Sequence, residues 1–362
     1  MEDRAVLSRR RLLQLAAGGG ALLGASALGG CRWLGGGGPE PQLLLVRGQL
    51  PAAWLKALPE PWRPRPLETP QALLQATDSP QPTTTMVALG DGWAQQLQRT
   101  RLRPLAVEGV LGELDPIAAP PSRLFAPEGQ PVLAFPWAFG TWVLLLRNRP
   151  DLLRRRQEGW SLLLHSSLRQ RLVLPSSPRV VIDLALRQLG LAAADPAALG
   201  DPRLPDQLAQ LRRQTLAFDE RDGVQLLLAG EADAAVVPSQ RALPLLLRDP
   251  RLEALLPETG SPLSWQLLLQ LAVDGDTSAP LPLEWLRDGL TLPLLDRLLA
   301  AGWVPPLPPQ RLQPALARWP QRLRPLLLPP PAVLAQCSNL PPFSPAEQLR
   351  WQALWDGAMA AG

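Results

Sequence analysis

Short apolar runs alternate with helical patterns along most of the chain. Gln42–Arg47 (QLLLVR) and Thr83–Leu89 (TTTMVAL) are each followed by a turn and then by a mixed polar and apolar stretch. Runs of this length predict buried strands, and their alternation with helices is typical of an α/β fold with parallel strands. The folded body is therefore expected to begin near Gln42.

The alternation continues towards the C-terminus. Thr141–Arg147 and Trp265–Val273 are further apolar strands, and strand–helix units repeat from Leu172 to Pro238. The proline-dense segment Pro305–Pro345 is expected to run over the surface in extended form. After it, Pro345–Ala358 predicts an amphipathic helix whose two tryptophans, Trp351 and Trp355, are spaced for packing.

Composition and charge narrow the class of protein. A chain of 362 residues that is 46% hydrophobic has room for roughly two domains with real cores. Its 44 prolines and 28 glycines indicate many punctuated loops and no collagen-like repeat. The net charge is only +4, and the first 30 residues contribute half of it. Such a weak field argues against a nucleic-acid partner.

The first residues carry the most specific signal. The basic stretch Ser8–Gln14 (SRRRLLQ) precedes an apolar run that ends in LGGC at Cys31. We interpret residues 1–30 as an export signal, similar to the twin-arginine type, with a lipobox. Cys31 would then be lipidated and 31–41 would form a flexible tether, placing the chain at the periplasmic face of the inner membrane. An uncleaved membrane anchor is the alternative, but the apolar run is too short and too rich in glycine for a comfortable transmembrane helix.

Little in the sequence supports catalysis. His165 is the only histidine, which removes every metal motif that needs two imidazoles. No phosphate-binding loop, nucleophile elbow or CxxC pair is present. We expect His165 to be a surface or capping residue and Cys337 to be a buried, inert thiol, with a reactive thiol as the alternative. The sequence therefore predicts no enzyme, cofactor or metal site.

The candidate ligand residues follow strands. Gly90-Asp91-Gly92-Trp93 comes directly after a strand, and so does the acidic group that contains Asp219 and Glu220. Ligands bind at the carboxyl ends of strands in open α/β sheets. Trp137 and Trp265 border strands and could offer flat aromatic faces. Helix capping would also explain Asp91, and a solvated loop would explain the acidic group.

Seven weak motifs occur in an order that resembles the extracellular solute-binding proteins of bacterial ABC importers, in the branch of spermidine and putrescine receptors. The resemblance runs from about Leu43 to Trp303. The segments that carry it are TMVALGDGWAQQL, AFPWAFGTWVLLLRN, EGWSLLL with RQRLVLP, VIDLALRQLG, LAGEADAAVV, ETGSPLSW and LLAAGWVPPLPP.

The resemblance implies a two-lobed periplasmic-binding-protein fold, type II-like, with hinge strands between the lobes. It assigns 42–137 plus 266–315 to lobe I and 138–265 plus 316–359 to lobe II. It also implies a small solute held between the lobes, an ABC permease and ATPase as partners, and membrane attachment through the lipid. A polyamine-like organic cation is the first candidate solute, bound by Asp91, Trp93, Trp137, Asp219, Glu220 and Trp265.

The sequence departs from polyamine receptors at several cleft positions. The acidic loop expected before VIDLALRQLG is occupied by Ser176, Ser177, Pro178 and Val180. Leu267 replaces an expected acid, Arg47 an aromatic residue, and Pro238 a tryptophan. A second hypothesis is therefore a degenerate receptor fold that serves as an envelope interaction or assembly lipoprotein. An exported hydrolase is a third and weaker one, because its motifs are absent.

Overall fold

The computed structural model describes residues 40–360 except 80, 82, 192–194, 221, 273–278, 341 and 343. The predicted export signal, Cys31 and most of the predicted tether lie outside the described residues. Strand β1 spans Gln42–Val46, so the body begins where the apolar pattern predicts. Glu40 pairs with Arg63 through a contact of 2.9 Å, which fixes the end of the predicted tether region to the next strand.

One ten-stranded sheet runs through the described chain. Its first half has the order β2-β1-β3-β10-β5, in which β1 is parallel to β2 and β3 while β10 is antiparallel to its neighbours. The bounds are β2 Arg63–Leu67, β3 Thr85–Gly90, β10 Leu263–Leu271 and β5 Ala134–Arg147, with β4 Leu102–Arg103 paired to β10. The prolines of β2 are tolerated because this strand lies at the sheet edge.

The second half of the sheet continues from the same strand in the order β5-β8-β6-β7. Its strands are β6 Leu172–Leu174, β7 Thr215–Phe218, β8 Ala234–Pro238 and β9 Leu252–Leu255, the last paired to β5. Strand β5 pairs with β10 up to Thr141 and with β8 from Trp142. It is therefore the strand that joins the two halves, and it starts seven residues earlier than the predicted Thr141.

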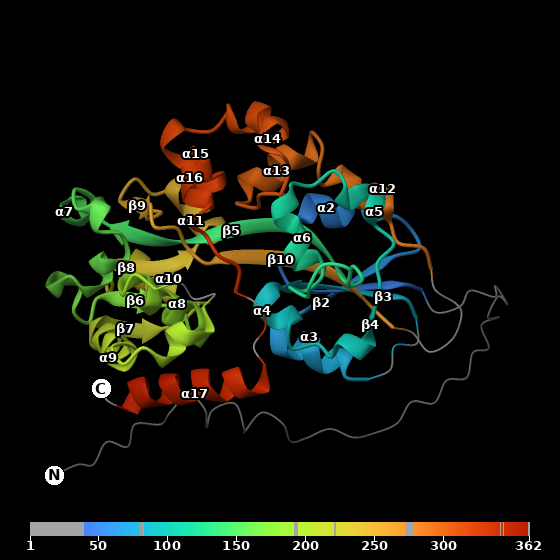
Figure 1. The fold of residues 1–362 in the computed structure, drawn as a ribbon. Helices are drawn as coiled ribbons and strands as arrows, with labels where there is room; N and C mark the ends of the chain where they lie inside the picture. Colours follow the sequence, from blue (N-terminus) through green and yellow to red (C-terminus); the bar gives the residue numbers. More distant parts are fainter. Residues whose placement is uncertain are drawn as a thin grey trace, which may run out of the picture. The chain divides into compact units, whose positions relative to one another are not determined.

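Helices cover both faces of the sheet (Figure 1). The α-helices are α2 Ala52–Lys56, α3 Pro70–Thr77, α4 Asp91–Ala94, α5 Glu108–Leu111, α6 Ala119–Ser122, α7 Pro150–Leu153, α8 Pro178–Gln188, α9 Leu204–Gln214, α10 Gly223–Ala229, α11 Ser239–Leu246, α12 Leu283–Asp288, α13 Leu294–Ala300, α14 Pro309–Leu316, α15 Arg324–Leu327, α16 Pro331–Leu334 and α17 Pro345–Ala360. Among the described helices, none is long and apolar enough to cross a membrane.

Tryptophans anchor the core of the first half. The rings of Trp54 and Trp285 stack with centroids 4.6 Å apart, and each indole N–H donates to the backbone carbonyl of the other residue at 2.9 and 2.8 Å. Buried indoles need such partners, because an unpaired N–H loses its bond to water. In the second half α17 packs on α9, with Trp351 buried as its spacing predicted.

The prediction of an extended surface segment at Pro305–Pro345 is wrong. Helices α14, α15 and α16 lie within it, and Leu312, Leu316 and Leu327 are buried in a hydrophobic core that extends from β1 to β8, which we call the first core. Each of these helices has a proline in its first turn, where the missing N–H has no intrahelical partner, and α14 has a second proline, Pro314, in its interior. The leucine spacing of helical turns was the signal that the proline count obscured.

Between α16 and α17 the chain passes alongside the start of β10. We call residues 336–340 the strap; in Figure 1 it is part of the red thread that runs past α4 before it reaches α17. Ser338 donates to the Ser261 carbonyl at 3.2 Å and accepts from the Leu263 N–H at 2.8 Å. Gly260 has a φ of +76°, and a Cβ there would lie 2.2 Å from the Gln336 carbonyl oxygen. The strap therefore fits against a position that only glycine can occupy.

We expect Gly260→Ala to destabilise the fold far more than Gly190→Ala. Gly190 also has a positive φ, +73°, but a Cβ there would meet nothing within 4 Å. The control therefore carries only the cost of the left-handed backbone, about 1 kcal/mol. Displacing the strap should add roughly 1–3 kcal/mol to that cost. Urea unfolding measures both losses, and equal losses would show that the strap does not pack on Gly260.

Candidate functional site

Strand ends from both halves of the sheet meet at one place, which we call the junction. Strand β3 ends at Gly90, and the carboxylate of Asp91 accepts the backbone N–H of Trp265, on β10, at 3.1 Å. From the second half, Glu220 follows β7, and its carboxylate accepts the backbone N–H of Ser177 at 3.1 Å. Burial is the main cause of the raised pKa of Glu220, and the nearby charge of Asp91 raises it further.

Burial changes the acidity of the groups at the junction. Asp91 is 8% exposed, and its desolvation raises the pKa of this carboxyl from 3.8 to about 6, although the charge of Arg179 opposes the change. Burial also lowers the pKa of the Arg179 guanidinium and raises that of the Glu220 carboxyl. A charge in this environment is stable only beside a partner of opposite sign.

Helix α8 supplies a line of alternating charges. Arg179, Asp183 and Arg187 are four residues apart, which places them on one face of the helix. Asp183 is fully buried and accepts a hydrogen bond from Arg187 Nε at 2.6 Å. Asp183 and Asp91 both interact electrostatically with Arg179. The line thus links α8 in the second half of the sheet to α4 in the first.

The base of the strap is bound by the last residue of this line. Arg187 donates from Nη1 to the carbonyl oxygens of Thr259 and Gln336 at 2.8 and 3.0 Å, and from Nη2 to Ser338 Oγ at 2.7 Å. One guanidinium therefore ties α8, the segment before β10 and the strap together.

The tip of the strap lies in the junction. Trp265 Nε1 donates to Asn339 Oδ1 at 2.8 Å, and Gln95 Nε2 donates to the Leu340 carbonyl at 3.1 Å. Arg179 donates to the same carbonyl and also to Gln95 Oε1, the latter at 2.7 Å. Residues of the chain itself thus hold the acceptor positions at the place where the strand ends converge.

The structure brings three of the six predicted ligand residues to the junction: Asp91, Glu220 and Trp265. Trp93 is half-buried on α4 and packs against the first core. Asp219 stands beside Glu220 in the chain, but its carboxylate accepts the backbone N–H of Asp222 at 2.9 Å, within its own turn.

Trp137 lies elsewhere. It is 1% exposed, and the rings that it contacts are Trp54 and Trp303, at 5.3 and 5.0 Å. The pairing of β5 with β10 shifts register at Gln266 and Leu267, which leaves Trp137 as an extra residue in the middle of β5. The expectation that it precedes the crossing strand is therefore corrected.

Sequence reasoning missed Arg179, Gln95 and Asn339. The spacing of Arg179, Asp183 and Arg187 was a readable signal, because charges four residues apart on a largely apolar helix need a common partner. No comparable pattern marks Gln95 or Asn339, whose partners are 245 and 74 residues away in the chain.

The other candidate reactive groups have structural roles. His165 accepts the backbone N–H of Ser167 at 3.3 Å and so caps a short helical turn, as expected. Cys337 is half-buried, and burial raises the pKa of its thiol. Within the described residues, no group of three or more His, Cys, Asp or Glu is arranged to hold a metal ion.

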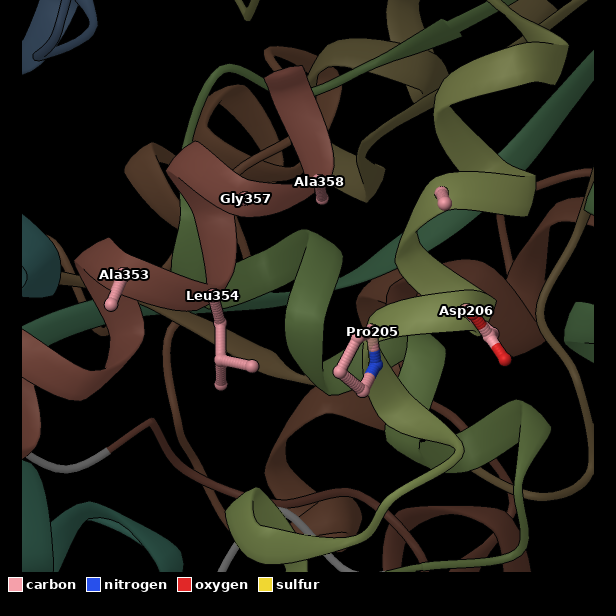
Figure 2. A pocket seen from close by; sticks show the side chains of 7 residues that line it. Pro205, Asp206, Ala353, Leu354, Gly357 and Ala358 are labelled. Atoms are coloured by element: carbon pink, nitrogen blue, oxygen red, sulfur yellow. The ribbon is translucent and has the colours of Figure 1, made fainter. Parts of the chain in front are cut away.

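A separate hollow of about 340 Å³ lies between α9 and α17 (Figure 2). It is lined by Pro205, Asp206, Ala209, Ala353, Leu354, Gly357 and Ala358. None of these residues belongs to the junction or the strap, so this hollow is a separate feature of the second half.

Comparisons with solved structures identify the fold. The spermidine/putrescine ABC transporter substrate-binding protein PotD of Streptococcus pneumoniae matches with a TM-score of 0.69 and 15% identity, over 89% of this chain and 99% of that one. A periplasmic thiamin binding protein matches with 0.59 and 14%, over 90% and 96%. The Trichodesmium IdiA (FutA) protein in complex with iron and citrate matches with 0.53 and 12%, over 89% and 98%.

These similarities show that the chain has the two-lobed α/β fold of periplasmic binding proteins, which confirms the predicted fold class. No family model matches the sequence, and no curated protein resembles it closely enough to be matched. The three proteins compared are named for different ligands, so their fold alone does not select a solute.

Asp91→Asn should change stability in a pH-dependent way. The raised pKa of Asp91 means that the folded chain holds this proton more tightly than the unfolded chain. That contribution is fully present below pH 3.8 and is lost as the pH rises through about 6, a loss of roughly 3 kcal/mol at about 1.4 kcal/mol per pH unit. Asparagine keeps an oxygen for the Trp265 N–H but does not titrate.

We therefore expect Asp91→Asn to match the parent near pH 4 and to be more stable, by up to roughly 3 kcal/mol, at pH 8. Urea unfolding at both pH values measures the difference, with Asp288→Asn on the exposed end of α12 as control. A difference that is the same at both pH values would mean that Asp91 titrates normally.

Proposed function

We propose that this chain is an exported, lipid-anchored solute-binding protein that delivers a small solute to an ABC importer. The observation that supports it best is the convergence of Asp91, Trp265 and Glu220 at the ends of strands from both halves of one sheet. Proteins with this fold that match the chain include two that are named as ABC transporter substrate-binding proteins. The export signal and lipobox of the sequence agree with such a role.

The arrangement of strands supplies a means of capture. Strand β5 and the segment from β9 to β10 both connect the two halves, so a bend in these two connections would open and close the junction. A solute in the junction would contact α4 from one side and α8 from the other. Closure around it would remove water from the buried charges and change the surface offered to the permease.

A polyamine-like organic cation is the first solute to test, because Asp91 and Glu220 are carboxylates and Trp265 is aromatic. Arg179 argues against a solute that is cationic throughout, since its guanidinium lies in the same cluster. At position 47, the resemblance implies an aromatic residue. This chain has Arg47 there, and its guanidinium pairs with Glu68 at 2.8 Å. The solute class therefore has to be determined by direct titration.

The decisive measurement is calorimetric titration of the purified chain with spermidine, putrescine, amino acids, thiamine, ferric citrate and oxyanions. We expect one class to bind with a dissociation constant of about 1 µM or tighter, which corresponds to roughly −8 kcal/mol or more. Removing a carboxylate that pairs with a buried ligand charge should then cost roughly 2–5 kcal/mol. Silence across the whole panel would contradict the proposed function.

Anchoring has its own test. We expect Cys31→Ala to abolish lipid attachment and to leave an uncut or misprocessed precursor, because only a thiol at that position accepts the lipid. Metabolic labelling with a fatty acid, followed by determination of the mature N-terminus, measures both effects. A Cys31→Ala protein that is still lipidated at its normal start would refute this prediction, whereas Cys337→Ala should behave like the parent.

A second candidate function is an envelope interaction or assembly lipoprotein built on a receptor fold. The occupation of the junction by the strap favours it, because a protein that no longer captures a solute has no need of an accessible site. X-ray scattering separates the two functions: a solute-binding protein becomes more compact when its ligand is added, while a scaffold keeps one shape.

A further inference from the structure

The donors at the junction converge on two oxygen atoms of the strap. Arg179 and Gln95 Nε2 both donate to the Leu340 carbonyl, and Trp265 Nε1 donates to Asn339 Oδ1. These donors come from α8, from the end of α4 and from β10, which are far apart in the sequence. None of the three bonds belongs to a helix or to a strand ladder, so regular secondary structure does not require them.

The same donors would be costly to leave without acceptors. Trp265 is fully buried, and Leu340, whose carbonyl accepts from Arg179 and Gln95, is 7% exposed. A buried N–H that loses its acceptor costs more than an ordinary hydrogen bond contributes. Whenever the strap tip leaves the junction, another acceptor of similar geometry has to take its place.

The charges around the strap tip favour an anionic acceptor. Arg179 is the guanidinium that contacts the tip, and a guanidinium binds a carboxylate through two parallel bonds more strongly than it binds a carbonyl. Asp91 and Glu220 border the same cluster, and an ammonium group on the ligand would face them. Asp91 already interacts electrostatically with Arg179, and this guanidinium disfavours a ligand with several positive charges and no negative one.

We propose that Arg179, Gln95 and Trp265 form a subsite for a carboxylate-bearing organic solute, and that residues Asn339 and Leu340 of the strap occupy this subsite as an internal competitor. The inference rests on the proposed function and deepens it. The solute enters by replacing the Leu340 carbonyl and the Asn339 amide oxygen with its own oxygens. The strap then leaves the junction while its base stays bound to Arg187 and Gly260.

If the strap competes with the solute, variants of the strap and variants of the subsite should change the affinity for the solute in opposite directions. Asn339→Ala removes one bond that holds the strap tip and leaves the donor Trp265 Nε1 available, so we expect it to strengthen solute binding about fivefold. Arg179→Gln removes the main donor to the solute and should weaken binding at least tenfold. Arg179→Lys keeps a point charge without the planar pair of donors and should recover part of the loss. A merely structural role would weaken binding in every variant.

A thiol at the strap tip reports the strap without knowledge of the natural solute. The chain has two cysteines, so the full chain with Cys31→Ser, Cys337→Ser and Leu340→Cys has one thiol, at a tip position that is 7% exposed. We expect its reaction with a disulfide reagent to be about fivefold faster when Asn339→Ala is added, because a bond that holds the tip is lost. Arg154→Gln, at an exposed position after α7, should react like the parent.

The probes are succinate, γ-aminobutyrate and spermidine, each measured by calorimetry and by the rate at which the thiol of Leu340→Cys is labelled. Binding of succinate or γ-aminobutyrate, with faster labelling and a tighter complex in Asn339→Ala, supports the proposal, and preference for γ-aminobutyrate assigns the ammonium to the acidic side. Binding of spermidine alone overturns the subsite but leaves the proposed function standing. Labelling and affinity unchanged in Asn339→Ala overturn the internal competitor, whichever probe binds.

Discussion

The buried charges on one face of α8 are the constraint on which the described structure depends. Asp183 is fully enclosed, and such a carboxylate is stable only because Arg187 bonds to it and Arg179 lies near it. Each arginine then has donors left, and these reach the strap, the segment before β10 and the side chain of Gln95. Removing one charge would leave its neighbours buried without compensation, so the junction holds together as a single network.

The same network explains why the junction differs from an open binding site. The tryptophans of the first half of the sheet stack and exchange hydrogen bonds, and β5 runs from this half into the second. Between these halves, the acceptors that a captured molecule would bring are provided by Asn339 and Leu340. Under the proposed function, a solute would therefore have to compete with part of the chain itself.

Much of the fold could be predicted from the sequence, because strands such as QLLLV and helices such as Leu204–Gln214 carry their period within a few residues. The helices inside Pro305–Pro345 were missed because the prediction used the number of prolines and did not consider that several of them stand in the first turn of a helix. Strand β2 was missed because its exposed pattern, with two prolines, has no alternation to detect. One rule, that polar groups after parallel strands share an edge, selected Asp91 and Glu220, whereas Trp265 was selected as an aromatic residue that borders a strand.

The sequence by itself therefore determined the α/β class and the order of most strands and helices. Of the six ligand residues that it predicted, three lie at the junction. Only the tertiary structure decided that Trp137 belongs to a core and that Arg179, Gln95 and Asn339 meet at the junction. The reason is physical: a period is a local property of neighbouring residues, whereas a hydrogen bond between Gln95 and Leu340 depends on how two distant parts of the chain pack. The pKa of Asp91 likewise depends on its burial in the folded chain, which its position in the sequence does not reveal.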